Sequence, residues 1–331
     1  MEQQKLPAVA LIGCGQWGRN IARALAGLGA LKLVCDPDAA AVEPFARALG
    51  ADFTTDMDAA LSSAVEAVAL ATPAITHASV AQKALRAGKH VYVEKPIALS
   101  TADAEFTAQV ARETGRILMI GHLLQYHPVF VKLLTMVRAG ELGTLQYIYS
   151  NRLNQGRVRT EENALWSLAP HDYSMILALA AQTPSAVSAS AQAAIQPDIP
   201  DIAVANIEFP DGLKAHMFCS WLNAYKEHRL AVTGSKGMAV FTDSTPNWED
   251  KLVFYPHVVV AGPRGPEFKK AEGQKVIVEQ GEPLKAEMRH FLEAVAAGSS
   301  VRTGPEEAIP VLKLLEATQI AMDGGKRVEM A

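Results

Sequence analysis

The sequence has few cysteines and no long apolar run, which argues against a cysteine-based metal site, a disulfide framework and a membrane-spanning helix. Three cysteines, Cys14, Cys35 and Cys219, occur among 331 residues, and their spacing fits neither a zinc site nor a disulfide framework. No apolar run approaches the roughly 20 residues of a membrane-spanning helix, and the first residues do not resemble a signal peptide. We therefore expect a cytoplasmic protein without a bound metal.

The chain also lacks a large excess of either positive or negative charge. The formal net charge at pH 7 is -4, which gives no electrostatic reason to expect nucleic acid or an anionic membrane as a partner. Apolar residues make up 49% of the chain and charged residues 20%, so there is enough apolar material for packed cores and no sign of disorder. A chain of 331 residues is long enough for about two domains.

The first third of the chain alternates short apolar runs with segments of helical length. This alternation predicts a doubly wound parallel sheet, an α/β architecture, in a first domain over residues 1–122. The expected strands are 8–12, 32–35, 67–71, 90–93 and 117–120, and the expected helices are 17–28, 40–49, 75–87 and 101–114.

After Gly121 the pattern changes to longer alternating runs joined by hairpin-like turns. A large, mostly antiparallel sheet is predicted by the runs at 144–153, 186–195, 202–209, 213–222, 229–233 and 238–242. A helix from His171 to Ala181 is expected to pack on one face of it. Further helices at 126–139, 283–297 and 305–322 complete a second, α+β domain over residues 123–331. The segment 248–280 is harder to place, as a strand plus loop.

A glycine-rich motif, Gly13-Cys14-Gly15-Gln16-Trp17-Gly18, separates the first expected strand from the first expected helix. Gly13 permits a tight turn, Gly15 lets the backbone approach a pyrophosphate, and Gly18 lets the helix pack closely on the sheet. The helix N-terminus then faces the anion. Asp36 ends the second strand, where a carboxylate accepts both ribose hydroxyls and repels a 2′-phosphate. Together they predict NAD rather than NADP as cofactor; a plain tight turn is the alternative.

Two further polar segments follow strands of the same sheet, on the edge where open α/β sheets bind ligands. Thr72-Pro73, with His77 four residues after the proline, follows the third strand, although these residues also suit a plain strand end and helix start. Glu94-Lys95-Pro96 follows the fourth strand. Lysine is disfavoured at a buried strand end unless it has a function, and a surface salt bridge is the alternative for it.

A histidine stands out in the second half of the chain. His171 follows Pro170 at the expected start of a helix, where the helix dipole favours the neutral imidazole and so a base. A histidine that only caps the helix fits the same pattern.

Three arginines precede this helix. Arg152, Arg157 and Arg159 lie within eight residues of one another, and their side chains could hold a diphosphate bidentately. Because Glu161 and Glu162 follow at once, a solvated basic loop is the alternative.

Taken together, these motifs resemble one family over essentially the whole chain. Gly13–Gly18, Thr72-Pro73 with His77, Glu94-Lys95-Pro96 and the His171 helix are similar to those of the glucose–fructose oxidoreductase, inositol dehydrogenase and rhizopine-catabolism (Gfo/Idh/MocA) family. The resemblance implies a Rossmann domain followed by a C-terminal sheet domain whose open face commonly makes oligomer contacts. It also implies oxidation of a sugar hydroxyl with NAD.

The resemblance implies roles for individual residues as well. Lys95 and His171 would be the catalytic pair that handles the proton and orients the substrate, and which of them is the base stays open. Asp36 would hold the adenosine ribose, and Glu94 with Pro96 would fix Lys95 against the cofactor. The expected cofactor-binding set is Gly13, Gly15, Gln16, Trp17, Gly18, Asp36, Thr72, Pro73, His77, Glu94, Lys95 and Pro96. The expected substrate-binding set is Lys95, His122, Tyr126, Arg152, Arg157, Arg159, Trp166, His171 and Asp172.

The substrate expected from the resemblance is a nucleotide sugar. Many relatives carry an aspartate four residues before the histidine, whereas this chain has Ser167, which disfavours inositol or a free monosaccharide. The stretches 147–153 and 156–166 are similar to nucleotide-sugar dehydrogenases of lipopolysaccharide and lipid A synthesis. We expect NAD-dependent oxidation of the 3-hydroxyl of a UDP-N-acetylhexosamine by a homodimer or homotetramer. A UDP-N-acetylglucosaminuronate substrate, and an NAD-binding regulator without turnover, are the alternatives.

Overall fold

The computed structural model describes residues 6–330, and the chain divides into two compact units. The first unit comprises the residues up to Tyr126 together with Glu282–Leu312, and the second comprises His127–Gly281 together with the residues from Lys313 onward. The division expected after His122 differs from this one in two respects. The chain leaves the first unit after Tyr126, and a later segment returns to it.

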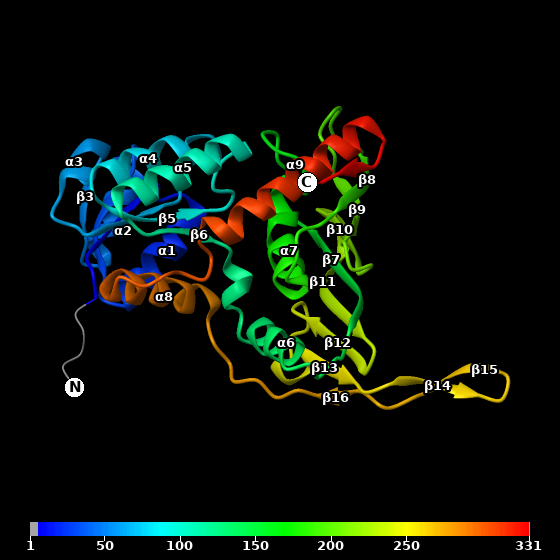
Figure 1. Ribbon diagram of the computed structural model, residues 1–331. Helices are drawn as coiled ribbons and strands as arrows, with labels where there is room; N and C mark the ends of the chain where they lie inside the picture. The colour runs from blue at the N-terminus through cyan, green and yellow to red at the C-terminus, as the bar shows by residue number, and fades with distance from the viewer. Residues whose placement is uncertain (1–5, 331) are drawn as a thin grey trace. The chain divides into compact units, whose positions relative to one another are not determined.

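The first unit is built on a parallel sheet of six strands in the order β3-β2-β1-β4-β5-β6 (Figure 1). The strands are β1 (Val9–Ile12), β2 (Leu31–Cys35), β3 (Asp52–Thr54), β4 (Ala67–Leu70), β5 (His90–Glu94) and β6 (Leu118–Gly121). The helices are α1 (Gln16–Gly27), α2 (Ala39–Ala48), α3 (Met57–Ser62), α4 (His77–Arg86), α5 (Thr101–Thr114) and α8 (Pro283–Ala297), with 3-10 turns η1 (Ala74–Thr76) and η2 (Leu123–Tyr126). This confirms the predicted doubly wound sheet, and the strand order is that of dinucleotide-binding folds. The sequence reading missed β3 and α3.

The return of α8 to the first unit has a clear packing reason. Leu284, Met288 and Phe291 of α8 are buried in the same apolar cluster as Ile21 of α1 and Tyr92 of β5. Figure 1 shows α8 and α1 on one side of the sheet, with α4 and α5 on the other. Covering both faces is what an all-parallel sheet requires, and α8 contributes to one of those two layers.

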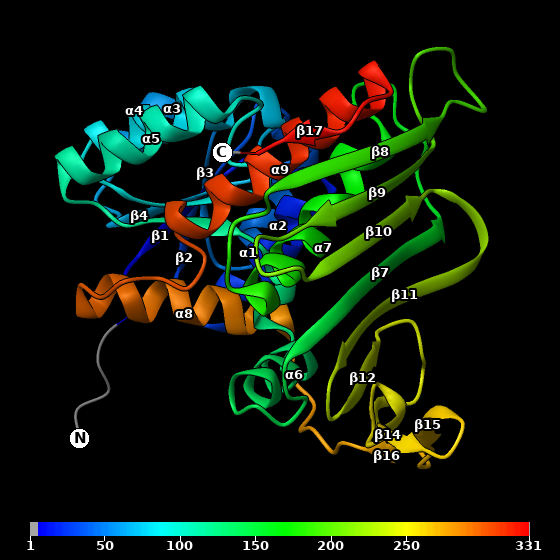
Figure 2. The ribbon, with the colours of Figure 1, turned by 45° about the vertical axis from the view of Figure 1, so that its right-hand side comes forward.

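The second unit contains a sheet of nine strands in the order β16-β13-β12-β11-β7-β10-β9-β8-β17 (Figure 2). The strands are β7 (Leu145–Gln155), β8 (Ala186–Gln192), β9 (Ile202–Glu208), β10 (Lys214–Ser220), β11 (Leu222–Gly234), β12 (Gly237–Thr242), β13 (Leu252–Tyr255), β16 (Gln274–Lys275) and β17 (Val328–Glu329). Only the β7–β10 pair of this sheet is parallel within the described chain, which confirms the mostly antiparallel sheet. The helices are α6 (Pro128–Arg138) and α7 (Ala164–Ala180), with a turn η3 (Trp248–Asp250); α9 (Pro305–Gly324) begins in the first unit and continues in the second.

The predicted start of the helix at His171 is wrong. Helix α7 begins at Ala164, because the Asn163 side chain caps it by accepting a hydrogen bond from the Trp166 amide at 3.1 Å. Pro170 therefore lies inside the helix. His171 is well past the first turn, so the argument that the N-terminal dipole keeps it neutral does not apply.

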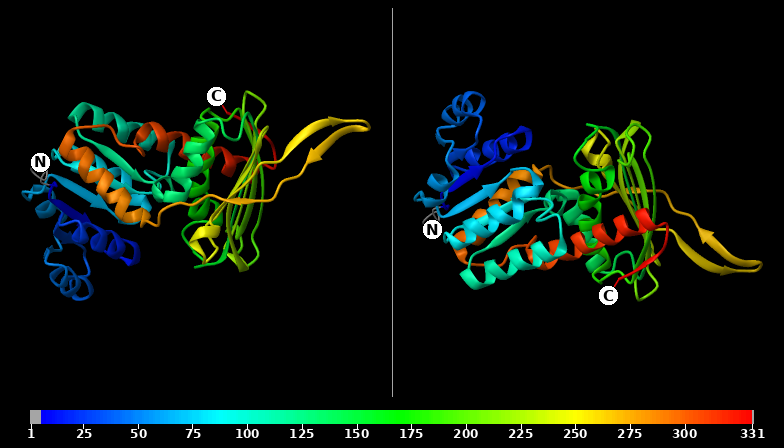
Figure 3. Two further views of the ribbon diagram at one scale, coloured as in Figure 1. Left: turned by 90° about the horizontal axis from the view of Figure 1, so that it is seen from below. Right: turned by 90° about the horizontal axis from the view of Figure 1, so that it is seen from above.

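The segment after Trp248 forms β13 and then a separate two-stranded hairpin, β14 (Val258–Gly262) with β15 (Gly265–Lys269). Figure 3 shows this hairpin extending away from the nine-stranded sheet of its own unit. Val259, Val260 and Phe268 are exposed on it. An isolated hairpin with exposed apolar side chains has little to stabilise it in water.

Candidate active site

The glycine-rich loop lies at the point where the strand order reverses, between β1 and β4. Gly13 has a φ of 87°, and a Cβ there would lie 2.7 Å from the Ala71 carbonyl carbon. A Cβ on Gly18 would overlap the Gly13 carbonyl oxygen. Both positions are therefore restricted to glycine by neighbouring backbone, which keeps the turn tight and α1 close to the sheet.

Gly15 is different, because a Cβ there would meet nothing within 4 Å. It is the N-cap residue of α1 and brings no side-chain cap, so the first amides of the helix have no partner from that side chain. Gly15, Gln16 and Trp17 are exposed. The open space beside a helix N-terminus with free amide donors fits the pyrophosphate of a dinucleotide.

Asp36 comes directly after β2 and is joined to the same loop. Its Oδ2 accepts a hydrogen bond from the Cys14 amide at 2.6 Å, and its Oδ1 accepts one from the Asp38 amide at 2.9 Å. A carboxylate oxygen can accept more than one hydrogen bond, so this fixed carboxylate still has acceptor capacity for ribose hydroxyls. Its position supports the predicted preference for NAD.

His77 connects two neighbouring loops. The ring is 2% exposed, with Nε2 at 2.8 Å from the Thr72 carbonyl oxygen and Nδ1 at 2.7 Å from the Pro96 carbonyl oxygen. Thr72 follows β4 and Pro96 follows β5, so the buried ring joins the two strand ends. His77 therefore holds the loops after β4 and β5 together from the interior of the unit.

Glu94 joins the glycine-rich loop to the end of β5. Its Oε1 accepts hydrogen bonds from Trp17 Nε1 at 2.6 Å and from the Tyr92 hydroxyl at 2.8 Å. Its Oε2 accepts one from the Lys95 amide at 3.2 Å. These three hydrogen bonds fix Glu94 beside the backbone of Lys95. Lys95 is half-buried and follows the carboxyl end of β5, at the edge where open α/β sheets bind ligands.

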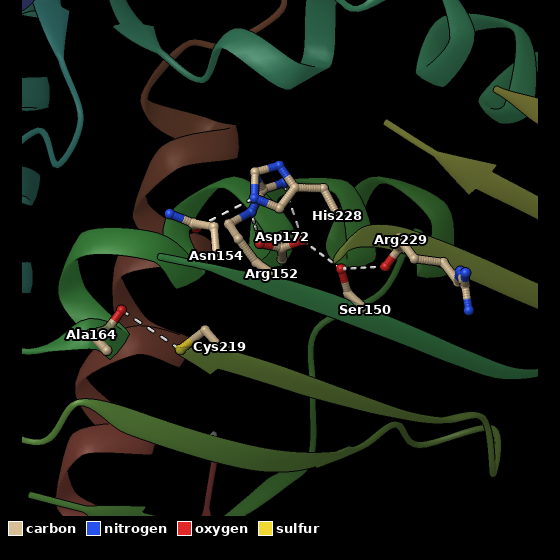
Figure 4. A network of polar contacts seen from close by, with 8 residues as sticks. All are labelled: Ser150, Arg152, Asn154, Ala164, Asp172, Cys219, His228 and Arg229. Atoms are coloured by element: carbon tan, nitrogen blue, oxygen red, sulfur yellow. Dashed lines mark hydrogen bonds and ion pairs between the residues drawn. The ribbon is translucent and has the colours of Figure 1, made fainter. Parts of the chain in front are cut away.

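In the second unit, Asp172 follows His171 on α7 and is 1% exposed. It accepts hydrogen bonds from Ser150 Oγ and from Arg152 Nε, both on β7 (Figure 4). Arg152 is itself 8% exposed. The pair binds α7 to the sheet, so the charge of Arg152 is already compensated within the protein.

His228 on β11 lies beside this ion pair. Its Nε2 is 3.4 Å from Asn154 Oδ1 (Figure 4). Burial, and next the charge of Arg152, lower its pKa to about 4. His228 is therefore neutral at physiological pH. The sequence reading missed His228 and Asn154, and the strand alternation from Ser150 through Arg152 to Asn154 is the signal that places these side chains on one face.

The structure does not bring the three predicted arginines together. Arg152 is buried in its ion pair, whereas Arg157 is exposed. Arg159 Nε lies 3.1 Å from Glu162 Oε1, as the alternative of a solvated loop anticipates. Trp166 donates a hydrogen bond from Nε1 to Gln319 Oε1 at 3.1 Å.

His122 and Tyr126 lie in the interior of the first unit, with exposures of 3% and 5%. His122 Nδ1 is 2.5 Å from Glu307 Oε2. The Tyr126 ring packs under the Arg302 guanidinium at 4.9 Å, and its hydroxyl is 3.3 Å from Thr303 Oγ1. Burial raises the pKa of Tyr126. Both side chains therefore contact their own unit rather than an open surface.

Within residues 6–330, no helix combines the length and the apolar character needed to cross a membrane. Nor does that part of the chain hold a group of three or more His, Cys, Asp or Glu residues able to hold a metal ion.

Two family models match the chain. One describes an oxidoreductase family with an NAD-binding Rossmann fold and matches residues 8–122, and the other describes the GFO/IDH/MocA C-terminal domain and matches residues 130–240. The chain belongs to the Gfo/Idh/MocA family. It is an oxidoreductase that uses NAD, and the open space at Gly15 with the fixed carboxylate of Asp36 fits that cofactor.

Among similar proteins, UDP-N-acetylglucosamine 3-dehydrogenase of Acidithiobacillus ferrooxidans is 28% identical over 295 residues, covering 87% of this chain and 88% of that protein. Its solved structure matches with a TM-score of 0.85 at 27% identity, over 96% and 98% of the two chains. The scyllo-inositol 2-dehydrogenase (NAD(+)) of Bacillus subtilis is 26% identical over 88% of this chain and 86% of its own. GenD2 from gentamicin A biosynthesis, solved in complex with NAD, gives a TM-score of 0.83 at 25% identity, over 100% and 98%.

Proposed function

We propose that this oxidoreductase oxidises the 3-hydroxyl of a UDP-N-acetylhexosamine, UDP-N-acetylglucosamine in the first instance, to the 3-keto sugar for lipopolysaccharide and lipid A synthesis. The relative named UDP-N-acetylglucosamine 3-dehydrogenase supports this, because the similarity spans nearly the full length of both chains. The inositol dehydrogenases among the relatives leave the substrate to be argued from the residues.

The observation that carries the proposal is the state of the carboxylates on α7. Asp172 is the only carboxylate of that helix, and it is buried in the ion pair with Arg152. Residue 167, one helical turn before His171, is a serine. No free carboxylate of α7 is thus available to hold the hydroxyls of a cyclitol. Exposed Arg157 offers a guanidinium for a diphosphate instead.

In this proposal Lys95 and His171 are the residues that handle the proton of the 3-hydroxyl. One of them accepts the proton of the 3-hydroxyl as the C–O bond becomes a carbonyl, and the other donates a hydrogen bond that stabilises the developing negative charge. NAD, when bound, supplies the carbon that accepts the hydride from carbon 3. Histidine is the side chain that most often acts as a base near neutral pH, so His171 is assigned that role, and the exchanged roles are the alternative.

The test is NADH formation, followed by absorbance, with purified protein and NAD. UDP-N-acetylglucosamine, its uronate and free N-acetylglucosamine are compared, each with a carbonyl trap that removes the keto product. We expect turnover with UDP-N-acetylglucosamine and none with the free sugar. Turnover with the uronate alone would favour the second nucleotide sugar, and NAD binding without any turnover would favour a regulator.

The role of Arg157 has its own comparison. Arg157→Met should raise the KM for the nucleotide sugar about ten-fold, since a charge-assisted hydrogen bond to phosphate contributes roughly 1.5–3 kcal/mol. Arg112→Met, which removes an exposed arginine from α5, should leave KM unchanged. Equal KM values for both variants would remove the diphosphate from the proposal.

We also propose a homodimer or homotetramer formed through the nine-stranded sheet. The face opposite α7 carries Tyr147 and Tyr149 of β7 and His216 of β10, and the rings of Tyr149 and His216 are stacked with their centroids 5.4 Å apart. Phe218 follows His216 on β10. A surface of aromatic side chains is typical of protein interfaces. Phe218→Lys should lower the mass found by light scattering to that of a monomer. Phe106→Lys, on an exposed phenylalanine of α5, should not.

The proposal places the reaction in the cytoplasm. All three cysteines of the chain are free and buried, as suits a reducing compartment. A tagged protein found outside the cytoplasmic fraction would contradict this placement.

A further inference from the structure

A buried carboxyl group lies behind the strand that carries Lys95. Glu287 of α8 is 0% exposed, and so is Tyr92 of β5. The Tyr92 hydroxyl lies 3.2 Å from Glu287 Oε2 and 2.8 Å from Glu94 Oε1. The other oxygen of Glu287 is buried and has no hydrogen-bond partner. One hydroxyl thus stands between two carboxyl groups.

The number of protons decides how this group of three is charged. A tyrosine hydroxyl has one proton, so it can donate to only one of the two carboxyl oxygens and must accept from the other. The shorter contact is to Glu94, which also accepts from the indole of the half-exposed Trp17. A carboxyl group that donates to the Tyr92 oxygen has to carry a proton, and the wholly buried Glu287 is the one placed to do so.

We infer that Glu287 is a neutral carboxylic acid whose proton is donated to Tyr92, and that the directed chain Glu287–Tyr92–Glu94 makes Glu287 a positioning residue for the dinucleotide loop and for Lys95. Tyr92 then donates to Glu94, and the ionised Glu94 receives Trp17 Nε1 and the Lys95 amide. A helix distant in the sequence thereby orients the acceptor on which the cofactor loop and the Lys95 backbone both depend.

The surroundings of Glu287 agree with a neutral acid. Burial, and next the negative charge of Glu94, raise its pKa well above 4.5, and Glu307 of α9 adds to the effect. Tyr126 of η2 also faces this group. Burial likewise raises the pKa of Tyr92, so its hydroxyl keeps its proton. The contact with the Tyr92 hydroxyl acts in the opposite direction on the pKa of Glu287, and the effect of burial is larger.

The sixth strand leaves room for this arrangement by ending in glycine. A Cβ on Gly121 would lie 2.5 Å from the Tyr92 hydroxyl oxygen and 2.9 Å from Glu94 Oε1. No side chain larger than hydrogen is therefore compatible with the observed contact between Tyr92 and Glu94. The backbone of Gly121 is not in the left-handed region, so the restriction comes from the side chains of Tyr92 and Glu94.

A carboxyl group that stays neutral in the folded protein and one that is held ionised change the free energy of unfolding with pH in opposite directions. Folding raises its pKa, so the folded protein keeps a proton that the unfolded chain releases above about pH 4.3. The contribution of Glu287 to the free energy of unfolding must therefore fall as the pH rises above that value. Glutamine carries an N–H donor in the same place and has no proton to lose, so Glu287→Gln should remove this loss.

The first test is thermal unfolding of the protein without NAD between about pH 5 and pH 8. The melting temperature of Glu287→Gln should rise relative to that of the natural protein as the pH rises. Glu293→Gln, the same change at an exposed position of α8, should differ from the natural protein by a constant amount. A Glu287→Gln protein that is less stable by the same amount at every pH would overturn the inference, because it would show an ionised acceptor.

The second test addresses positioning. Glu287→Gln should bind NAD within about two-fold of the natural protein, whereas Tyr92→Phe, which breaks the chain, should bind it about five- to ten-fold more weakly, as expected for one lost hydrogen bond. Equal NAD affinity for all three proteins would overturn the positioning role. The effect on Lys95 rests on the proposed function, but unfolding and NAD binding need no substrate. A failure of the substrate assignment would therefore leave both results standing.

Discussion

The glycine-rich loop offers a direct test, because two of its glycines are required for different reasons. At Gly13 the φ of 87° and the 2.7 Å approach of a Cβ to Ala71 both exclude a side chain. At Gly15 a Cβ meets no atom of the protein within 4 Å. Gly13→Ala should therefore damage the fold, whereas Gly15→Ala should leave the fold intact and occupy the space that a pyrophosphate needs.

The magnitudes follow from these contacts. A left-handed conformation costs a non-glycine residue about 1–2 kcal/mol, and the overlap with Ala71 adds to it. A loss of about 2 kcal/mol lowers Tm by roughly 4–8 °C in a unit of this size, so Gly13→Ala should lose at least that much. In Gly15→Ala the expected loss is one charge-assisted hydrogen bond of about 1.5–3 kcal/mol, which weakens NAD binding about 10- to 100-fold.

Thermal unfolding without ligand and calorimetric titration with NAD measure the two effects separately. Gly15→Ala should match the natural Tm and bind NAD weakly. If Gly15→Ala bound NAD as tightly as the natural protein, the space beside the α1 N-terminus would not be the pyrophosphate site. If Gly13→Ala kept the natural Tm, the close approach to Ala71 would not exist in solution.

Three other outcomes are expected. Asp36→Asn removes the charge that repels a 2′-phosphate, so the ratio of NADP to NAD dissociation constants should fall about ten-fold; an unchanged ratio would contradict the role of Asp36. Asp172→Leu leaves the Arg152 charge buried and should cost about 3–5 kcal/mol in urea unfolding. Adding Arg152→Met should restore most of the loss, and additive losses would refute the pairing. Lys95→Met and His171→Asn should each lower kcat about 10²- to 10⁴-fold with NAD binding retained, and near-natural turnover of both variants at saturating substrate would exclude this pair.

Most of the first unit could be predicted because its signals are local. A buried apolar run followed by a helical pattern and a glycine is read over a dozen residues, and the helix α5 was predicted with its observed bounds. The short strand β3 and helix α3 carry too few apolar residues to show a period. The membership of α8 depends on packing against Ile21 and Tyr92, which are far away in the sequence.

The candidate site was harder to predict than the fold. Pro170 is a usual sign of a helix start, but the cap at Asn163 acts earlier and the proline is tolerated inside α7. The ion pair of Arg152 with Asp172 joins a strand to a helix, and no local pattern reports it. The three arginines that are close in the sequence therefore differ in the structure. Arg152 is buried in its ion pair with Asp172, whereas Arg157 and Arg159 lie on the loop after β7, where Arg159 pairs with Glu162.

Gly121 allows the buried acid to be traced in other sequences. Its backbone conformation is open to any residue, so the usual reasons for conserving a glycine do not hold there. A homologue with alanine at this position cannot place a tyrosine hydroxyl and a glutamate oxygen as this chain does. We expect glycine at this position to co-vary with the pair Tyr92 and Glu287. An alignment would then separate relatives that have a buried protonated carboxyl group at the position of Glu287 from relatives that have apolar side chains there.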